Sequence, residues 1–147
     1  MALIREASAG YMANWAARLF ARELERQLAP SGIAPAYMPV LFALADGGSL
    51  PQKELARRAA VEQPTMAATL KRMQRDALIT RQPDPADGRS ALVTLTPLAL
   101  GQVASVERVV SAINALALEQ FTPAERQQFL GLLGRVITVL EAQDAAD

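Results

Sequence analysis

The sequence predicts a mainly α-helical fold with one small β-hairpin. Apolar residues recur at three- and four-residue spacing along most of the 147-residue chain, which is the helical pattern. Prolines and glycines separate these segments and mark where helices begin and end. Apolar and polar residues alternate between Val93 and Thr96, as expected of a strand. At 51% hydrophobic residues, the chain is long enough for a single domain with a core, and we expect one domain over residues 1–147.

The first half of the chain predicts two helices. Residues 5–29 carry an apolar stripe, and Pro30 and Gly32 end it. A second helix follows Pro35, with Pro39 in its first turn, where a missing N–H costs little.

Two shorter helices and a hairpin come next. Pro51 and Pro64 stand at positions that first helical turns accept, so we expect helices from 51 to 60 and from 64 to 77. In the second of these, Met66, Leu70, Met73 and Ala77 form the inward face, and the opposite face carries Thr65, Thr69 and Arg72. Residues 78–83 and 91–95 are strand candidates, joined by a turn at residues 84–90.

The last fifty residues predict two long helices, 97–119 and 123–143. Thr122 and Glu125 have the spacing of a capping box, with Pro123 at the first helical position. A helix of about 22 residues spans roughly 33 Å, as much as a small domain. The apolar stripes exceed what the middle of the chain could cover, which indicates a dimer interface. The alternative is a monomeric bundle that uses the same stripes as its own core.

The composition excludes several classes of function. The chain has no cysteine and no histidine, so disulfides, thiol chemistry and the commonest zinc ligands are absent. We therefore expect no enzyme, no metal and no cofactor. The first six residues lack a long apolar run, and no run approaches the ~20 apolar residues of a spanning helix. The expected location is the cytoplasm.

The net charge of zero hides an uneven distribution. Residues 51–90 hold eight basic and five acidic side chains, a net charge of +3, and the rest of the chain carries −3. Nucleic-acid binding depends on the local basic face, so this segment is a candidate for contact with phosphates. The bias is modest and gives weak support by itself.

The order of helix, helix, basic helix and basic-tipped hairpin resembles the MarR family of winged helix-turn-helix regulators. The segments that carry the resemblance are residues 70–73 and 78–81, the loop Asp-Pro-Ala-Asp-Gly-Arg-Ser at 84–90, and residues 92–96. It implies a winged helix-turn-helix over 35–96, with dimerisation helices at 1–32 and 97–147. Two positions depart from the family pattern: Ala77 stands where glycine is usual, and Ala68 where a basic residue is frequent. If Ala77 has positive φ, local strain follows.

The resemblance and the helical spacing together give candidate DNA contacts. The start of a recognition helix enters the major groove, where Gln63 could read adenine and Thr65 a base or a thymine methyl group. The alternative for these residues is capping and solvation, and for the basic ones a solvated helix face. The candidates on or before the two middle helices are Ser49, Gln52, Gln63, Pro64, Thr65, Thr69, Lys71, Arg72 and Arg75.

Arg89 is the sharpest candidate. Its guanidinium follows Gly88 at the turn and can reach a minor groove, whose negative potential favours arginine. We expect Asp87 to orient the Arg89 guanidinium by a charge-assisted hydrogen bond. The alternative is a solvated surface pair.

MarR-like proteins often bind small aromatic or phenolic anions between the dimer helices and the DNA module. The candidate residues for such an effector lie in the first two predicted helices, where core packing is the alternative role: Tyr11, Trp15, Arg18, Tyr37, Met38 and Phe42.

The sequence thus predicts a ligand-responsive transcriptional regulator, a repressor by resemblance, that binds pseudo-palindromic duplex DNA as a homodimer. The rival is a winged-helix interaction module or scaffold that does not bind DNA.

Overall fold

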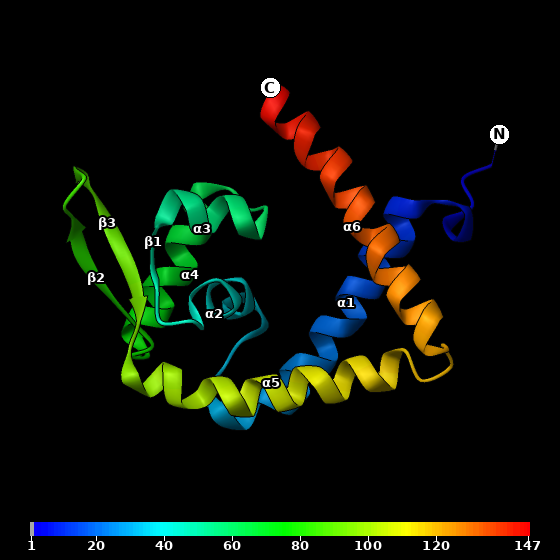
Figure 1. Cartoon of the computed structure of the whole chain (residues 1–147), viewed down its shortest axis with the longest axis horizontal. Helices are drawn as coiled ribbons and strands as arrows, with labels where there is room; N and C mark the ends of the chain where they lie inside the picture. The colour runs from blue at the N-terminus through cyan, green and yellow to red at the C-terminus, as the bar shows by residue number, and fades with distance from the viewer. Residues whose placement is uncertain (1) are drawn as a thin grey trace. The chain divides into compact units, whose positions relative to one another are not determined.

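The computed structural model describes residues 2–147, which form helices α1–α6 and strands β1–β3 (Figure 1). The chain divides into two compact units, one up to Val110 and one from Ser111, and helix α5 (Pro97–Ala117) begins in the first and ends in the second. The single domain over residues 1–147 stays a prediction. The mainly helical fold with a small hairpin is confirmed.

Helix α1 (Ala9–Leu28) begins four residues later than predicted. The Ser8 side chain accepts a hydrogen bond from the Tyr11 N–H at 3.2 Å and caps the helix, and residues Arg5–Ala7 form a separate 3-10 turn. Leu28 is buried, whereas Met12 and Leu19 are 44% and 50% exposed. The apolar stripe of α1 is therefore largely uncovered in the single chain.

Helix α2 (Met38–Leu44) follows a 3-10 turn at Pro35–Tyr37 and carries Pro39 in its first turn, as predicted. It ends where the Gly47 N–H donates to the Leu44 carbonyl at 3.0 Å. The φ of Gly47 is +87°, a conformation that favours glycine.

Helices α3 (Gln52–Ala59) and α4 (Gln63–Arg75) both end in Schellman motifs. At the end of α4, the Leu78 N–H donates to the Met73 carbonyl at 2.9 Å and the Ala77 N–H to the Gln74 carbonyl at 3.1 Å. The left-handed position is Ala77, with φ of +60°. The strain anticipated for Ala77 is thus present.

The end of α3 repeats this geometry. The Val61 N–H donates to the Ala56 carbonyl and the Ala60 N–H to the Arg57 carbonyl, both at 3.1 Å. Ala60 has φ of +53°. Both helices thus end on an alanine in a conformation that costs an L-residue free energy.

The sheet has three antiparallel strands in the order β1–β3–β2. Strands β2 (Ile79–Asp84) and β3 (Asp87–Leu95) form the predicted hairpin, which extends away from α3 and α4 in Figure 1. Strand β1 (Ser49–Pro51) was not predicted and pairs with residues 92–94 of β3. Pro51, expected in the first turn of a helix, instead ends β1 and precedes the first residue of α3.

The core of the first unit joins these elements. Leu44 of α2, Leu55 of α3, Leu70 of α4 and Val93 of β3 are each at most 1% exposed. Burial of such side chains contributes about 1.5–3 kcal/mol each before the entropy cost of ordering. This packing fixes the start of α4 and the base of the hairpin within one rigid module.

The second unit contains the end of α5 and helix α6 (Pro123–Ala146), three residues longer than predicted. The capping box is confirmed: the Glu125 N–H donates to Thr122 Oγ1 at 3.1 Å, and the Thr122 N–H donates to Glu125 Oε1 at 2.9 Å. Phe121 and Phe129 meet edge to face with ring centroids 5.7 Å apart. The large apolar side chains of α6 that remain 47–61% exposed are Leu130, Leu132, Val136, Ile137, Val139 and Leu140.

Candidate nucleic-acid interface

The start of α4 presents three of the predicted contact residues to solvent. Gln63, Pro64 and Thr65 are all exposed. Glu62, the N-cap residue, makes no side-chain cap hydrogen bond. This leaves exposed polar groups and uncapped backbone N–H groups at the start of α4, an arrangement that can bind an anion such as a phosphate.

Thr69 does not lie on the outer face of α4, so its predicted placement is wrong. Its exposure is 9%, and it falls with Met66, Leu70 and Met73 on the buried side. At about 100° per residue, positions three and four apart share one face, which places Thr69 beside Met66 and Met73. Thr69 is therefore a core threonine and not a candidate DNA contact.

The two helix starts are joined by a pair of glutamines. Gln52 Nε2 donates to Gln63 Oε1 at 3.3 Å and lies 3.5 Å from the Gln63 carbonyl oxygen. Gln63 keeps its side-chain nitrogen without a partner among residues 2–147. Gln52 therefore sets the orientation of the Gln63 amide and lies beside it.

The Ser49 side chain makes a hydrogen bond within the sheet. Its hydroxyl lies 2.6 Å from Thr94 Oγ1, across the β1–β3 register pair that the two residues form. The Ser49 side chain remains exposed at the edge of the module, with one hydrogen bond already satisfied.

The basic residues of α4 are exposed but differ in their neighbours. Lys71 forms no ion pair within the described chain. The Arg72 guanidinium lies over the Tyr37 ring, 5.5 Å from its centroid. Arg75 Nε lies 3.3 Å from Asp76 Oδ1. The three cations thus project from α4 with increasing constraint toward its C-terminal end.

The hairpin turn falls at Pro85 and Ala86, so the predicted turn at residues 84–90 is too long, and Arg89 lies near the start of β3. The Arg89 side chain forms no ion pair in residues 2–147. Asp87 Oδ1 accepts a hydrogen bond from the Arg89 N–H at 3.0 Å, and Asp84 Oδ1 accepts one from the Ala86 N–H at 2.9 Å. The prediction that the Arg89 guanidinium donates to Asp87 is wrong, because the Asp87 carboxylate accepts from the Arg89 backbone N–H instead. Asp87 supports the wing by shaping its loop, and the Arg89 cation stays available.

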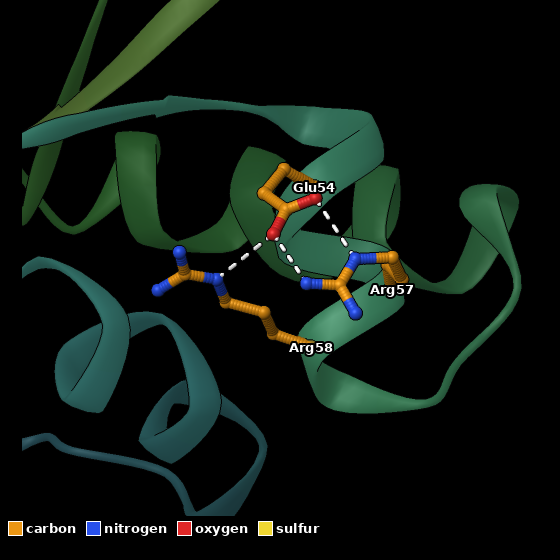
Figure 2. Close-up of polar contacts among 3 residues, drawn as sticks. All are labelled: Glu54, Arg57 and Arg58. Carbon is orange, nitrogen blue, oxygen red and sulfur yellow. Dashed lines mark hydrogen bonds and ion pairs between the residues drawn. The ribbon is translucent and has the colours of Figure 1, made fainter. Parts of the chain in front are cut away.

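A cluster that the sequence reading missed lies on α3 (Figure 2). Glu54 Oε1 accepts from Arg57 Nη2 at 2.6 Å and from Arg58 Nε at 3.0 Å, and Glu54 Oε2 accepts from Arg57 Nε at 2.9 Å. The hydrogen bonds from Arg57 and then Arg58 lower the pKa of Glu54 to about 2. The i, i+3 and i, i+4 spacing was the available signal. One carboxylate therefore offsets part of the positive charge of α3.

An apolar cavity of about 240 Å³ lies between α2 and α5. Its walls include Met38 and Phe42, two of the predicted effector residues. Glu107 is its one charged lining residue within the described chain. The full lining is Met38, Leu41, Phe42, Ala45, Val103, Val106, Glu107 and Val110.

The other predicted effector residues do not line this cavity. Tyr37 is 1% exposed, and its hydroxyl donates to Asp76 Oδ2 at 2.7 Å. Its side chain is therefore buried in the core and bonded to the C-cap residue of α4. Tyr11 and Trp15 pair edge to face on α1 with centroids 6.3 Å apart. The Arg5 guanidinium lies over the Trp15 ring, 4.2 Å from its centroid, and Arg18 is absent from the cavity lining.

Residues 2–147 contain no group of three or more acidic, histidine or cysteine side chains that could hold a metal ion. No helix in this range is both long and apolar enough to cross a membrane.

Comparison with known proteins gives related sequences and a related fold. A sequence model described as "MarR family" matches residues 31–90. The chain is 29% identical over 116 residues to the uncharacterized HTH-type transcriptional regulator YwoH of Bacillus subtilis, covering 79% of this chain and 84% of that protein. It is 31% identical over 97 residues to the HTH-type transcriptional repressor NicR of Pseudomonas putida, covering 66% of this chain and 61% of that protein.

A solved structure shares the fold. The transcriptional repressor CouR, bound to a 23-mer DNA duplex, superposes with a TM-score of 0.80 and 22% identity, covering 93% of this chain and 99% of CouR. Residues 31–90, which contain α2, α3, α4 and the first part of the hairpin, are the part of the chain that matches the MarR family of transcriptional regulators.

Proposed function

We propose that this protein is a homodimeric repressor that binds pseudo-palindromic duplex DNA and releases it when a small aromatic ligand binds. The observation that carries the proposal is the pairing of an exposed α4 start with an Arg89 cation at the hairpin, both fixed to one core. The DNA duplex bound by the relative CouR and the name of the relative NicR support DNA binding and repression.

Helix α4 is the proposed reader of base sequence. In helix-turn-helix proteins the first residues of the second helix enter the major groove, and Gln63 and Thr65 are exposed there. Gln63 suits an adenine edge, which glutamine contacts with two hydrogen bonds. In this proposal Lys71, Arg72 and Arg75 contact phosphates along the groove.

The hairpin is the proposed minor-groove contact. The Asp87 turn fixes the Arg89 backbone, so the cation is held at the tip without losing its charge to an ion pair. Arginine is favoured in narrow minor grooves by their negative potential. The wing therefore adds affinity and reads groove width beside the α4 contact.

Dimerisation through the exposed apolar faces would supply the two-fold symmetry. The large apolar side chains that α1 and α6 leave exposed are typical of association surfaces. Two α4 helices would then meet half-sites about one helical turn apart, roughly 34–36 Å.

The proposed ligand is a single-ring aromatic without negative charge. The cavity of about 240 Å³ is lined by apolar side chains, and Glu107 would repel a carboxylate or phenolate. This differs from the anion that the family resemblance implies. A ligand that prefers a dimer with altered α4 spacing would shift the population away from the DNA-binding form.

The test of DNA binding is selection of duplexes from a random pool, followed by fluorescence anisotropy across a salt series. We expect a pseudo-palindromic consensus and an affinity that falls steeply with salt. Sedimentation of the free protein should give a dimer. Absence of any salt-dependent duplex binding would favour the rival function, a winged-helix interaction module.

The test of the ligand class compares benzyl alcohol with benzoate. We expect benzyl alcohol to raise the melting temperature and benzoate to have no effect, since binding to the native state stabilises it. Val103→Phe fills the cavity wall and should remove the shift. A larger shift with benzoate would contradict the assignment.

A further inference from the structure

Tyr37 makes a long-range contact with the end of α4. It lies in the 3-10 turn before α2, it is 1% exposed, and its hydroxyl donates to Asp76 Oδ2 at 2.7 Å across 39 residues of sequence. Burial and the contact with Asp76 raise the pKa of Tyr37, so the phenol stays a donor. The bond therefore ties the segment before α2 to the end of the helix proposed to read DNA.

The partner carboxylate stands where a helix does not favour one. Asp76 is the C-cap residue of α4, at the negative end of the helix dipole. The hydrogen bond from Tyr37 is the largest cause that lowers the pKa of Asp76, and the bond from Arg75 adds to it. Asp76 is therefore held by two partners, the buried Tyr37 and the exposed Arg75.

The same tyrosine also contacts Arg72. The guanidinium carbon of Arg72 lies 5.5 Å from the Tyr37 ring centroid, within cation–π range. Arg72 and Arg75 are exposed on α4, and both side chains are long and flexible when unconstrained. One buried ring thus limits the conformations of two cations, Arg72 directly and Arg75 through Asp76.

We propose that Tyr37 is a positioning residue for DNA binding, which acts by ordering Arg72 with its ring face and Arg75 through the Asp76 carboxylate. The inference rests on the proposed reading of DNA by α4. It predicts that Tyr37 affects affinity through these arginines and not only through the stability of the core. The Tyr37 ring contacts Arg72 and the Tyr37 hydroxyl contacts Asp76, so substitutions that remove only the hydroxyl or the whole ring can separate the two effects.

The first experiment uses the free protein and needs no DNA. Arginine Nε–Hε resonances are recorded for the wild type, Tyr37→Phe and Tyr37→Leu. We expect the Arg72 resonance to be shifted by the ring in the wild type and in Tyr37→Phe, and to lose that shift in Tyr37→Leu. We expect the Arg75 resonance to move in both variants. An Arg72 resonance that is the same in all three proteins would overturn the proposal.

The second experiment is a double-mutant cycle on the affinity for a duplex selected from a random pool. Arg72→Ala removes a charge-assisted contact with phosphate and should weaken binding by about tenfold or more in the wild type. In Tyr37→Leu the same change should cost less than about twofold, because the arginine is already disordered. Val40→Ala is the control: Val40 is also fully buried, and Arg72→Ala should keep its full effect there.

The outcomes are distinct. An undiminished tenfold effect of Arg72→Ala in Tyr37→Leu would overturn the inference while leaving the proposed DNA binding intact. If Tyr37→Leu does not fold, the cycle pairs Tyr37→Phe with Arg75→Ala, where coupling is expected, and with Arg89→Ala, where the effects should add. Additivity in both cycles would overturn the inference. A wild-type protein that binds no duplex would overturn the proposed function, and with it this role for Tyr37.

Discussion

Replacement of Ala77 by glycine should stabilise the protein. Ala77 occupies the left-handed position of the Schellman motif that ends α4, with φ of +60°. An L-residue pays roughly 1–2 kcal/mol for this conformation, whereas glycine pays almost nothing. The two hydrogen bonds of the motif join backbone atoms only. Thr96 Oγ1 donates to the Ala77 carbonyl at 2.7 Å, so on residue 77 this bond also uses a backbone atom.

The gain is reduced by the unfolded state. Glycine has more freedom in the unfolded chain, which costs about 0.4–1 kcal/mol. The net change should therefore be a stabilisation of about 0.5–1 kcal/mol. For a chain of about 150 residues this corresponds to a melting temperature about 1–4 °C higher.

The assay is urea denaturation followed by circular dichroism, at one fixed protein concentration because association shifts apparent stability. Ala68→Gly is the matched control: Ala68 is exposed in the interior of the same helix, where glycine should cost about 1 kcal/mol. Ala60→Gly, at φ of +53°, should repeat the gain. If Ala77→Gly destabilised the protein as much as Ala68→Gly does, the argument from backbone strain would be refuted.

Three further predictions concern the wing, α3 and α6. Arg89→Ala should leave stability within about 0.5 kcal/mol and reduce the slope of log affinity against log salt by about 2 for a dimer; an unchanged slope in anisotropy titrations would remove Arg89 from the interface. Glu54 has a pKa of about 2 against an ordinary 4.5, so its contribution to stability is present above pH 4.5 and is lost as the pH falls toward 2. Glu54→Gln should therefore lose less stability than the wild type over that range, and equal losses in acid denaturation curves would contradict the ion pairs. Thr122→Ala should cost about 1 kcal/mol through loss of the N-cap, while Thr122→Ser should cost little, as measured by thermal melting.

Local features account for what could be predicted of the site. Gln63, Thr65 and Arg89 are exposed as expected, because a helix start beside Pro64 and a hairpin turn at Pro85 and Ala86 are decided by a few neighbouring residues. Thr69 was misplaced because the boundary between the buried and exposed faces of α4 depends on what packs against it. The ion pairs of Glu54 are local to α3, and their i, i+3 and i, i+4 spacing was visible in the sequence.

The sequence by itself determined the helices, the Thr122 capping box and the hairpin, because hydrophobic periodicity, prolines, glycines and capping residues act over a few positions. Tertiary structure alone decided the pairing of Ser49–Pro51 with β3, the bond from Tyr37 to Asp76 and the cavity beside Phe42. Each of these joins residues that are far apart in the chain. Their contacts form only when the core brings distant segments together, and a pattern within a few neighbouring residues cannot show which distant segments will meet.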